Sequence, residues 1–256
     1  MQPYLDVFGR TIPSYGLCMA IGILLSCYIC FIKAHKYKLD INSLIVIVAC
    51  IIGLGLLGAK LLYLFVSCDI KEVFSRLLHG DVSDLTSGGL VYYGGLIGGI
   101  IGALLGARIS GTTSEFAVYC DAIVPVIPFG HAFGRIGCFL GGCCYGAPYT
   151  GIGAVTFPKV GVVKPVFPVQ LLEAALNVMI FILLILPWNK QKRGFFSLYL
   201  YLILYSLVRF VLEFLRGDEI RGITQGLSTS QWISMGLFIC GCILLVMSAK
   251  REKGSI

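Results

Sequence analysis

Charged residues are scarce in this chain of 256 residues. Only 13% of the residues are Asp, Glu, Lys or Arg, whereas 57% are hydrophobic. Soluble globular domains carry about 25% charged residues. The shortage of charge therefore excludes a soluble globule and indicates an integral membrane protein.

The chain also lacks a polar stretch long enough to form a separate soluble domain. Apolar segments of roughly 20 residues, the length that crosses a bilayer as a helix, follow one another from end to end. We expect an all-α integral membrane fold, in which residues 1–256 form a single domain. Its seven transmembrane helices are predicted at 12–32, 43–66, 93–109, 116–140, 167–186, 195–215 and 228–248.

The first apolar segment lacks the features of a cleaved signal peptide. Only Arg10 precedes it, no small-residue cleavage site follows, and Lys33 and Lys36 come after the apolar run. The excess of Lys and Arg in alternate short loops places the N-terminus outside and the C-terminus in the cytoplasm, as for a multi-pass plasma membrane protein. Two long connections, about 67–92 and 141–166, are then extracytoplasmic. We expect a short amphipathic helix near 70–78 in the first, and an irregular second connection because it is rich in Gly and Pro.

The net charge of +7 comes mostly from the predicted cytoplasmic ends of the helices. Such residues favour anionic lipid headgroups, so membrane lipids are expected partners and nucleic acid is not. Of the 11 cysteines, about half lie inside apolar segments, where cysteine acts as a small hydrophobic residue. The number of cysteines therefore does not indicate whether the protein lies in an oxidising or a reducing compartment.

Arginine appears where lipid is expected. Placing a guanidinium at mid-bilayer depth costs about 3 kcal/mol on insertion scales, so such a residue requires a counter-charge or a function. Arg209, Glu213 and Arg216 are spaced i, i+4, i+7, which predicts that they share one inward face of a helix.

A second set of polar side chains enters the fifth predicted span. Gln170, Glu173 and Asn177 share a helix face, so a carboxylate is available to neutralise an arginine. These charges can be structural ion pairs alone. However, cations outnumber carboxylates inside the predicted spans, which favours a bound anion. The charged residues concerned are Lys60, Arg135, Arg209, Arg216, Glu173 and Glu213.

Glycine recurs every four residues along the third predicted span. Such stripes allow helix backbones to approach closely in lipid, so packing is the expected role from Gly98 to Gly106. At Gly94 and Gly95 a second role is open, because free N–H groups at a helix start can receive an anion.

The most distinctive segment reads Gly134-Arg-Ile-Gly-Cys-Phe-Leu-Gly-Gly-Cys-Cys-Tyr-Gly146. It resembles the signature Gly-Arg-x-Gly-Asn-Phe-x-Asn-Gly-Glu-x-x-Gly of the phosphatidylglycerol:prolipoprotein diacylglyceryl transferases. Further motifs similar to this family occur in order over almost the whole chain: Ser14-Tyr15-Gly16-Leu17, Lys60 with Tyr63, Tyr93-Gly-Gly-Leu-Ile-Gly98, Pro125-Val-Ile-Pro-Phe-Gly130, Phe167-Pro-Val-Gln-Leu-Leu-Glu173, Arg209-Phe-Val-Leu-Glu-Phe-Leu-Arg216 and Leu227-Ser-Thr-Ser-Gln231.

The resemblance implies a bacterial transferase of lipoprotein biosynthesis. It would transfer the diacylglyceryl group of phosphatidylglycerol to the lipobox cysteine thiol of a prolipoprotein at the outer face of the plasma membrane, releasing glycerol 1-phosphate. The expected catalytic residues are Arg135, Arg209 and Tyr93, and we expect neither a cofactor nor a metal. The residues expected to bind or position substrates are Tyr15, Lys60, Gly94, Gly95, Asp121, Cys138, Cys143, Gly146, Glu173, Glu213, Arg216 and Gln231.

The chain departs from the family signature at three positions. Cys138 and Gly141 replace the two asparagines, and Cys143 replaces the glutamate. Together with Cys144 and the nearby His131, the cysteines could bind a metal, carry a lipid intermediate, form a Cys138–Cys143 or Cys138–Cys144 disulfide, or only fill space. The spacing Cys-x4-Cys-Cys matches no standard zinc signature, and these interpretations stay open.

Tyr93 stands where the family has a histidine. A phenol with a pKa of ~10 is a poor base at neutral pH, whereas the acceptor thiol, with a pKa of ~8.5, is already partly ionised. We therefore expect Arg135 and Arg209 to hold the phosphodiester and stabilise the departing phosphate. Tyr93 would donate a hydrogen bond or relay a proton.

Two other functions are open. Because the histidine, asparagine and glutamate positions have changed, a paralogue could transfer a phosphatidylglycerol-derived group to a glycan or another lipid. An anion or lipid transporter is less favoured, because transporters tend to show internal repeats and none is visible.

Overall fold

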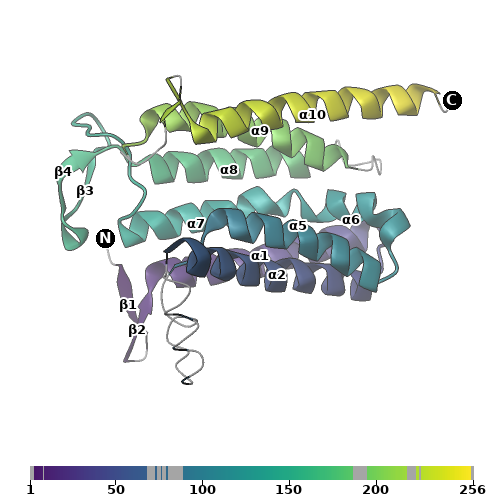
Figure 1. The fold of residues 1–256 in the computed structure, drawn as a ribbon, viewed down its shortest axis with the longest axis horizontal. Helices are drawn as coiled ribbons and strands as arrows, with labels where there is room; N and C mark the ends of the chain where they lie inside the picture. Colours follow the sequence, from purple (N-terminus) through teal and green to yellow (C-terminus); the bar gives the residue numbers. More distant parts are fainter. Residues whose placement is uncertain are drawn as a thin grey trace. The chain divides into compact units, whose positions relative to one another are not determined.

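The computed structural model describes residues 3–7, 9–67, 73, 76, 79, 89–186, 195–217, 223–224 and 226–254. These residues are mostly helical (Figure 1). They divide into two compact units. Unit 1 comprises Met1–Cys30 and Cys120–Ile256, and unit 2 comprises Phe31–Tyr119.

Apolar helices dominate the described chain. Five helical segments are long and apolar enough to cross a membrane. They are α1 (Ser14–Lys36), α2 (Ile41–Ser67), α5 (Tyr92–Ile109), the segment Phe196–Leu215 that begins with α9 (Phe196–Leu212), and α10 (Thr229–Gly254). The bent pair α6 (Phe116–Ile123) and α7 (Val126–Gly141) passes the same test, and α8 (Val169–Ile185) is a shorter apolar helix. These helices fit the predicted membrane protein, while the number of spans and the sidedness of the termini stay predictions.

The segment predicted as one span at 116–140 is broken into two helices. α6 and α7 meet at an angle of 44°, and the break falls at Val124 and Pro125. Proline has no backbone N–H, and its ring disfavours a helical conformation of the preceding residue. The prediction of a single helix is therefore wrong at this point.

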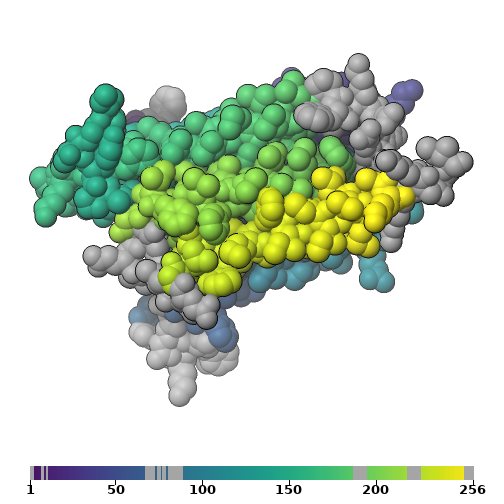
Figure 2. All heavy atoms as spheres, turned by 90° about the horizontal axis from the view of Figure 1, so that it is seen from above, coloured from purple at the N-terminus to yellow at the C-terminus, as the bar shows by residue number. Residues whose placement is uncertain are grey.

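Unit 1 is built on helices that pack in the order of the chain. α7 contacts α8, α8 contacts α9, and α9 contacts α10, as the ribbon shows (Figure 1). α9 and α10 also lie next to each other on the surface (Figure 2). Small residues of α7 face α1, because a Cβ at Gly137 would meet Tyr15 and a Cβ at Gly134 would meet Met19. The start of α1 therefore lies beside the end of α7.

Short antiparallel hairpins interrupt the helical pattern. β1 (Tyr4–Val7) pairs with β2 (Arg10–Pro13), and β5 (Ile223–Thr224) pairs with β6 (Leu227–Ser228). The connection predicted to be irregular at 141–166 contains a third hairpin, β3 (Val155–Phe157) with β4 (Val162–Val166), joined through the short 3-10 helix η2 (Pro158–Val160). Valines on both sides of a Pro/Gly turn favour these strands. The helix expected near 70–78 falls mostly outside the described residues.

Unit 2 holds α2 and α5 together through the glycine stripe. A Cβ at Gly98 would lie 2.1 Å from the carbonyl oxygen of Leu54, and one at Gly102 would lie 2.3 Å from that of Cys50. Only glycine allows backbones to approach so closely. The predicted packing role is confirmed, and α5 is followed by the 3-10 helix η1 (Thr113–Glu115).

Candidate functional site

Four helices of unit 1 bring polar groups to one end. The side-chain amide of Gln170, at the start of α8, donates to the carbonyl oxygen of Cys143, just after α7, at 2.8 Å. Near the end of α9, Arg209 Nη2 donates to Ser230 Oγ, in the first turn of α10, at 3.2 Å. Consecutive helices run in opposite directions, so the ends of α7 and α9 meet the starts of α8 and α10.

Two arginines form buried ion pairs at this end. Arg135 Nη2 on α7 lies 3.0 Å from Glu173 Oε1 on α8, and the two side chains are 15% and 2% exposed. Arg209 Nη2 lies 2.9 Å from Glu213 Oε2, with side chains 16% and 5% exposed. The prediction that Glu173 is available to neutralise an arginine is confirmed.

His131 joins the two ion pairs into one cluster. Its Nε2 lies 3.7 Å from Glu173 Oε1, and both guanidinium groups, of Arg135 and Arg209, act on it electrostatically. Its ring packs 5.7 Å from that of Tyr205 on α9. Sequence reasoning gave these two residues no role here, although each stands four residues before an arginine and so shares its helix face.

We call His131, Arg135, Glu173, Arg209 and Glu213 the arginine cluster. Two of its guanidinium nitrogens, Arg135 Nε and Arg209 Nη1, are buried without a hydrogen-bond partner among the described residues. Leaving a buried donor unsatisfied costs about 1–3 kcal/mol, and more for a charged group. An anion with several oxygen atoms is the ligand that would satisfy both donors.

Arg216 does not share a helix face with Arg209, and that prediction is wrong. The α-helix ends before Glu213, continues as the 3-10 helix η4 (Glu213–Leu215), and Arg216 is extended with φ −78° and ψ 145°. Its backbone pairs with Gly146 as an antiparallel bridge. A Cβ at Gly146 would lie 2.7 Å from two backbone carbonyl oxygens. The last glycine of the signature thus allows the close approach that pulls Arg216 out of the helix.

Gln231 positions the start of α10. The N–H of Ser228 donates to Gln231 Oε1 at 2.9 Å, and the N–H of Gln231 donates to Ser228 Oγ at 3.3 Å. This reciprocal capping box satisfies two donors of the first helical turn. The same helical turn carries Ser230, the hydrogen-bond partner of Arg209, and the positioning role of Gln231 stays a prediction. Gln231 Nε2 is itself buried without a partner among the described residues.

Asp121 lies elsewhere in unit 1. Its carboxylate accepts a hydrogen bond of 2.8 Å from the N–H of Ser197, at the start of α9. At about 1.5 Å per residue, that position lies roughly 18 Å along the helix from Arg209. The structure therefore does not bring Asp121 to the arginine cluster.

Three cysteine thiols converge where α7 ends. Gly142 closes the helix with φ +74°, Cys144 is also left-handed with φ +58°, and the N–H of Cys143 donates to the carbonyl oxygen of Cys138 at 3.1 Å. This tight turn brings the three Sγ atoms within 4.8 Å of one another. The described cysteines are free thiols, so neither disulfide considered from the sequence is formed in this structure.

The electrostatic surroundings of Cys144 are unusual. Hydrogen bonds from the thiols of Cys138 and Cys143, and then the charges of Arg135 and Arg216, lower the pKa of this thiol. Cys144 is one of the cysteines expected from the sequence to bind a metal, carry a lipid intermediate, form a disulfide or fill space. Its lowered pKa favours the thiolate form at this position.

Tyr15 packs against the same part of α7. A Cβ at Gly137 would lie 3.2 Å from the Tyr15 ring. The phenol is half-buried within electrostatic range of Cys138 and Arg135. Tyr15 therefore lies at the same end of unit 1 as the arginine cluster, and its role at the site stays a prediction.

The other predicted site residues belong to unit 2. Lys60 Nζ lies 5.0 Å from the ring centre of Tyr63. Tyr93, 47% exposed, stands in the first turn of α5. The N–H of Gly95 donates to the carbonyl oxygen of the residue before α5 at 3.2 Å, so it is not free for an anion. Gly94 packs against the α2 backbone.

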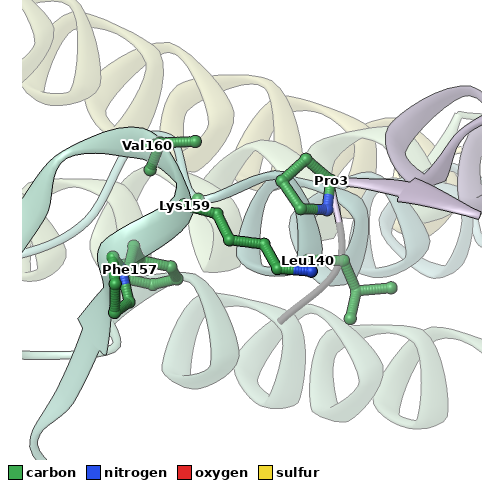
Figure 3. Close-up of a pocket in the computed structure, with 7 residues that line it drawn as sticks. Pro3, Leu140, Phe157, Lys159 and Val160 are labelled. Atoms are coloured by element: carbon green, nitrogen blue, oxygen red, sulfur yellow. The ribbon is translucent and has the colours of Figure 1, made fainter.

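A mostly apolar pocket of about 280 Å³ adjoins the end of α7. Leu140 and Gly142 line one side, and Phe157 and Lys159 of the β3–β4 hairpin line the other. The Lys159 side chain extends across it towards Leu140 (Figure 3). The hairpin thus adds an apolar surface with one cation next to the cysteine turn.

Known proteins resemble this chain over nearly its whole length. The model of the family described as prolipoprotein diacylglyceryl transferase matches residues 3–247. Phosphatidylglycerol–prolipoprotein diacylglyceryl transferase 2 of Clostridium perfringens is 32% identical, covering 97% of both chains. The similarly named enzyme of Clostridium tetani is 32% identical over 99% of this chain and 100% of the relative. That of Finegoldia magna is 29% identical over 96% of this chain and 95% of the relative.

Proposed function

Because this chain belongs to the prolipoprotein diacylglyceryl transferase family, we propose that its arginine cluster binds the phosphate of phosphatidylglycerol during diacylglyceryl transfer to a prolipoprotein. The chain is a transferase of lipoprotein biosynthesis with several membrane-spanning helices. The observation that carries the proposal is the pair of buried, unsatisfied donors, Arg135 Nε and Arg209 Nη1. Phosphatidylglycerol carries one anionic phosphodiester, whose oxygen atoms accept such hydrogen bonds.

The reaction forms a carbon–sulfur bond and breaks a carbon–oxygen bond. The acceptor sulfur attacks the carbon of the diacylglyceryl group that is bonded to the phosphate oxygen, and the bonding electron pair leaves with that oxygen. The thiol proton passes to water, directly or through the Tyr93 relay. The phosphate begins with one negative charge and approaches two as glycerol 1-phosphate departs. Cations that are already in place therefore stabilise the transition state more than they stabilise the bound donor lipid.

The carboxylates have a positioning role in this proposal. Glu173 and Glu213 each hold one guanidinium through an ion pair, so that its remaining donors stay directed into the site. Tyr93 would donate a hydrogen bond or relay the thiol proton. The remaining substrate contacts are proposed for Tyr15, Lys60, Gly94, Cys138, Cys143, Gly146 and Arg216.

The arrangement in the membrane is part of the proposal. We place seven spans in the plasma membrane as one membrane domain, counting α6 with α7 as one span and α8 as another. The N-terminus and the connections 67–92 and 141–166 would then be extracytoplasmic, and the C-terminus cytoplasmic. Donor lipid would enter from the outer leaflet, and a lipobox cysteine would be the acceptor.

The test is a turnover assay with the full chain in lipid nanodiscs that contain phosphatidylglycerol. A lipobox peptide is added, and its mass shift and the release of glycerol phosphate are measured. Arg135→Ala and Arg209→Ala are each expected to lower turnover by about 100- to 1,000-fold, as when a transition-state donor is removed.

Arg108→Ala is the matched control, because Arg108 is an exposed cation at the end of α5. It should leave turnover unchanged. Full activity in both arginine-cluster variants would overturn the proposed donor site. Release of glycerol phosphate only with a glycan or lipid acceptor would instead favour a different acceptor, which the changed signature positions Cys138 and Cys143 make worth including.

A further inference from the structure

The cysteine turn after α7 forms a compact set of sulfur ligands. Cys138 comes from the helix, whereas Cys143 and Cys144 come from the turn, and their three Sγ atoms lie within 4.8 Å of one another. Metal–sulfur bonds to zinc are about 2.3 Å long, which places three sulfurs around one ion roughly 4 Å apart. Small rotations of the side chains are enough to reach that geometry.

The backbone holds these ligands in place. The N–H of Cys143 donates to the carbonyl oxygen of Cys138 at 3.1 Å, and the buried amide of Gln170 donates to the Cys143 carbonyl oxygen at 2.8 Å. Cys144 adopts a left-handed conformation, with φ +58°, that a side-chain-bearing residue rarely takes. Such a conformation is often found where a functional site requires it.

The surrounding charges suit a metal–thiolate complex. A divalent ion with three thiolates carries a net charge of −1. Arg135 and Arg216 both act electrostatically on Cys144, so positive charge is available to balance the complex. Sulfur-only ligands select thiophilic ions such as Zn²⁺ or Cu⁺ over Mg²⁺ or Ca²⁺.

We propose that Cys138, Cys143 and Cys144 form a binding site for a thiophilic metal ion, with Zn²⁺ as the probe. Cys143 is exposed, which leaves the remaining coordination position to water or another ligand. Metal binding at this site does not depend on the phosphate binding proposed for the arginine cluster. A bound ion would pin the end of α7 to the turn that leads to Gly146.

The experiment titrates Zn²⁺ into the reduced, full-length protein in nanodiscs. We expect one equivalent to bind and to protect three thiols from maleimide. Cys138→Ser, Cys143→Ser and Cys144→Ser should each weaken binding by at least about 100-fold, more than changes in outer-shell partners typically do. Cys240→Ser is the matched control, because this exposed cysteine lies on α10 outside the cluster, and its affinity should equal that of the wild type.

Two outcomes would overturn the site. One is wild-type protein that is fully reduced and binds no Zn²⁺. The other is binding that persists unchanged in the Cys138→Ser/Cys143→Ser/Cys144→Ser protein. The thiol-protection measurement needs only the wild-type chain, so a variant that fails to fold does not obscure the result.

Discussion

The two units hold their helices together in different ways. In unit 2, α2 and α5 touch backbone to backbone, and a Cβ at Gly58 would lie only 2.4 Å from the Gly94 carbonyl oxygen. In unit 1, α7 and α8 are joined through buried polar side chains, among them Glu173 with 1% exposure. At Gly58 and Gly94 the α2–α5 contact involves no charged or polar side chain, whereas the α7–α8 contact places charged side chains inside an apolar protein.

The two kinds of contact differ in what they can do, because the α2–α5 contact only packs helices whereas the polar contacts of unit 1 can bind a ligand. The groove along α2 and α5, of about 330 Å³, is lined only by glycine and large apolar residues. The arginine cluster instead presents buried donors that a ligand can satisfy. We infer that substitutions in the arginine cluster change turnover and charge-dependent stability, while those in the α2–α5 contact from Gly98 to Gly106 change stability alone.

The largest effect is expected for Glu173→Gln. Removal of the carboxylate leaves the Arg135 guanidinium buried without its counter-charge, which typically costs about 3–5 kcal/mol of stability. Unfolding in detergent measures the loss. Glu115→Gln, at an exposed acid of unit 2, is the control and should change little. Arg135→Gln combined with Glu173→Gln should recover part of the loss, and a purely additive result would contradict the pairing.

A smaller loss is expected for Gly102→Ala. Its new Cβ would meet the Cys50 carbonyl oxygen at 2.3 Å, and overpacking of this kind costs about 1–3 kcal/mol. Turnover per folded molecule should stay at the wild-type value. Gly53→Ala on α2 is the control, because a Cβ there meets nothing within 4 Å. Equal melting temperatures for the two variants would show that the stripe does not set the contact.

Tyr93→Phe tests whether unit 2 shares in the chemistry. In the proposed function the hydroxyl contributes one hydrogen bond or a proton relay. We therefore expect Tyr93→Phe to lower turnover by about tenfold while phosphatidylglycerol binding is retained. Tyr92→Phe, at the neighbouring exposed tyrosine, should be silent. Unchanged turnover would confine the chemistry to unit 1 and contradict the role proposed for Tyr93, whereas complete loss would make the hydroxyl chemically essential.

The smallest effect concerns the cap of α2 and depends on pH. The hydroxyl and N–H of Ser43 donate to the Asp40 carboxylate, which lowers the pKa of Asp40. Its stabilising contribution is therefore present above the ordinary Asp pKa and is lost as the pH falls through the lower folded value. Asp40→Asn keeps a capping acceptor but should remove this acid dependence from the melting temperature. Ser228→Ala, at the uncharged cap of α10, should leave the dependence intact.

Much of the fold was accessible from local patterns. Apolar length predicted helices suited to a membrane, and the helix face of Glu173 predicted a partner for an arginine. Four-residue glycine spacing predicted close backbone packing of the third predicted span, although not that α2 is its partner. His131 could have been found as well, because it stands one helical turn before Arg135. These features depend on neighbours within a few residues, which a sequence displays directly.

Other features required contacts between distant segments. Arg216 leaves the helix because its backbone pairs with Gly146. Asp121 accepts a hydrogen bond from the N–H of Ser197, at the opposite end of α9 from Arg209. The cysteine spacing matched no standard zinc signature, yet a left-handed turn brings the three sulfurs together.

The sequence by itself determined an apolar helical protein in which cations outnumber carboxylates inside the predicted spans. It could do so because hydrophobicity and helical spacing are local properties of the chain. Only the tertiary structure decided which cation meets which carboxylate and which donors are left for a ligand. Those choices depend on the packing of helices and on backbone bridges, and residues far apart in sequence carry no local sign of them.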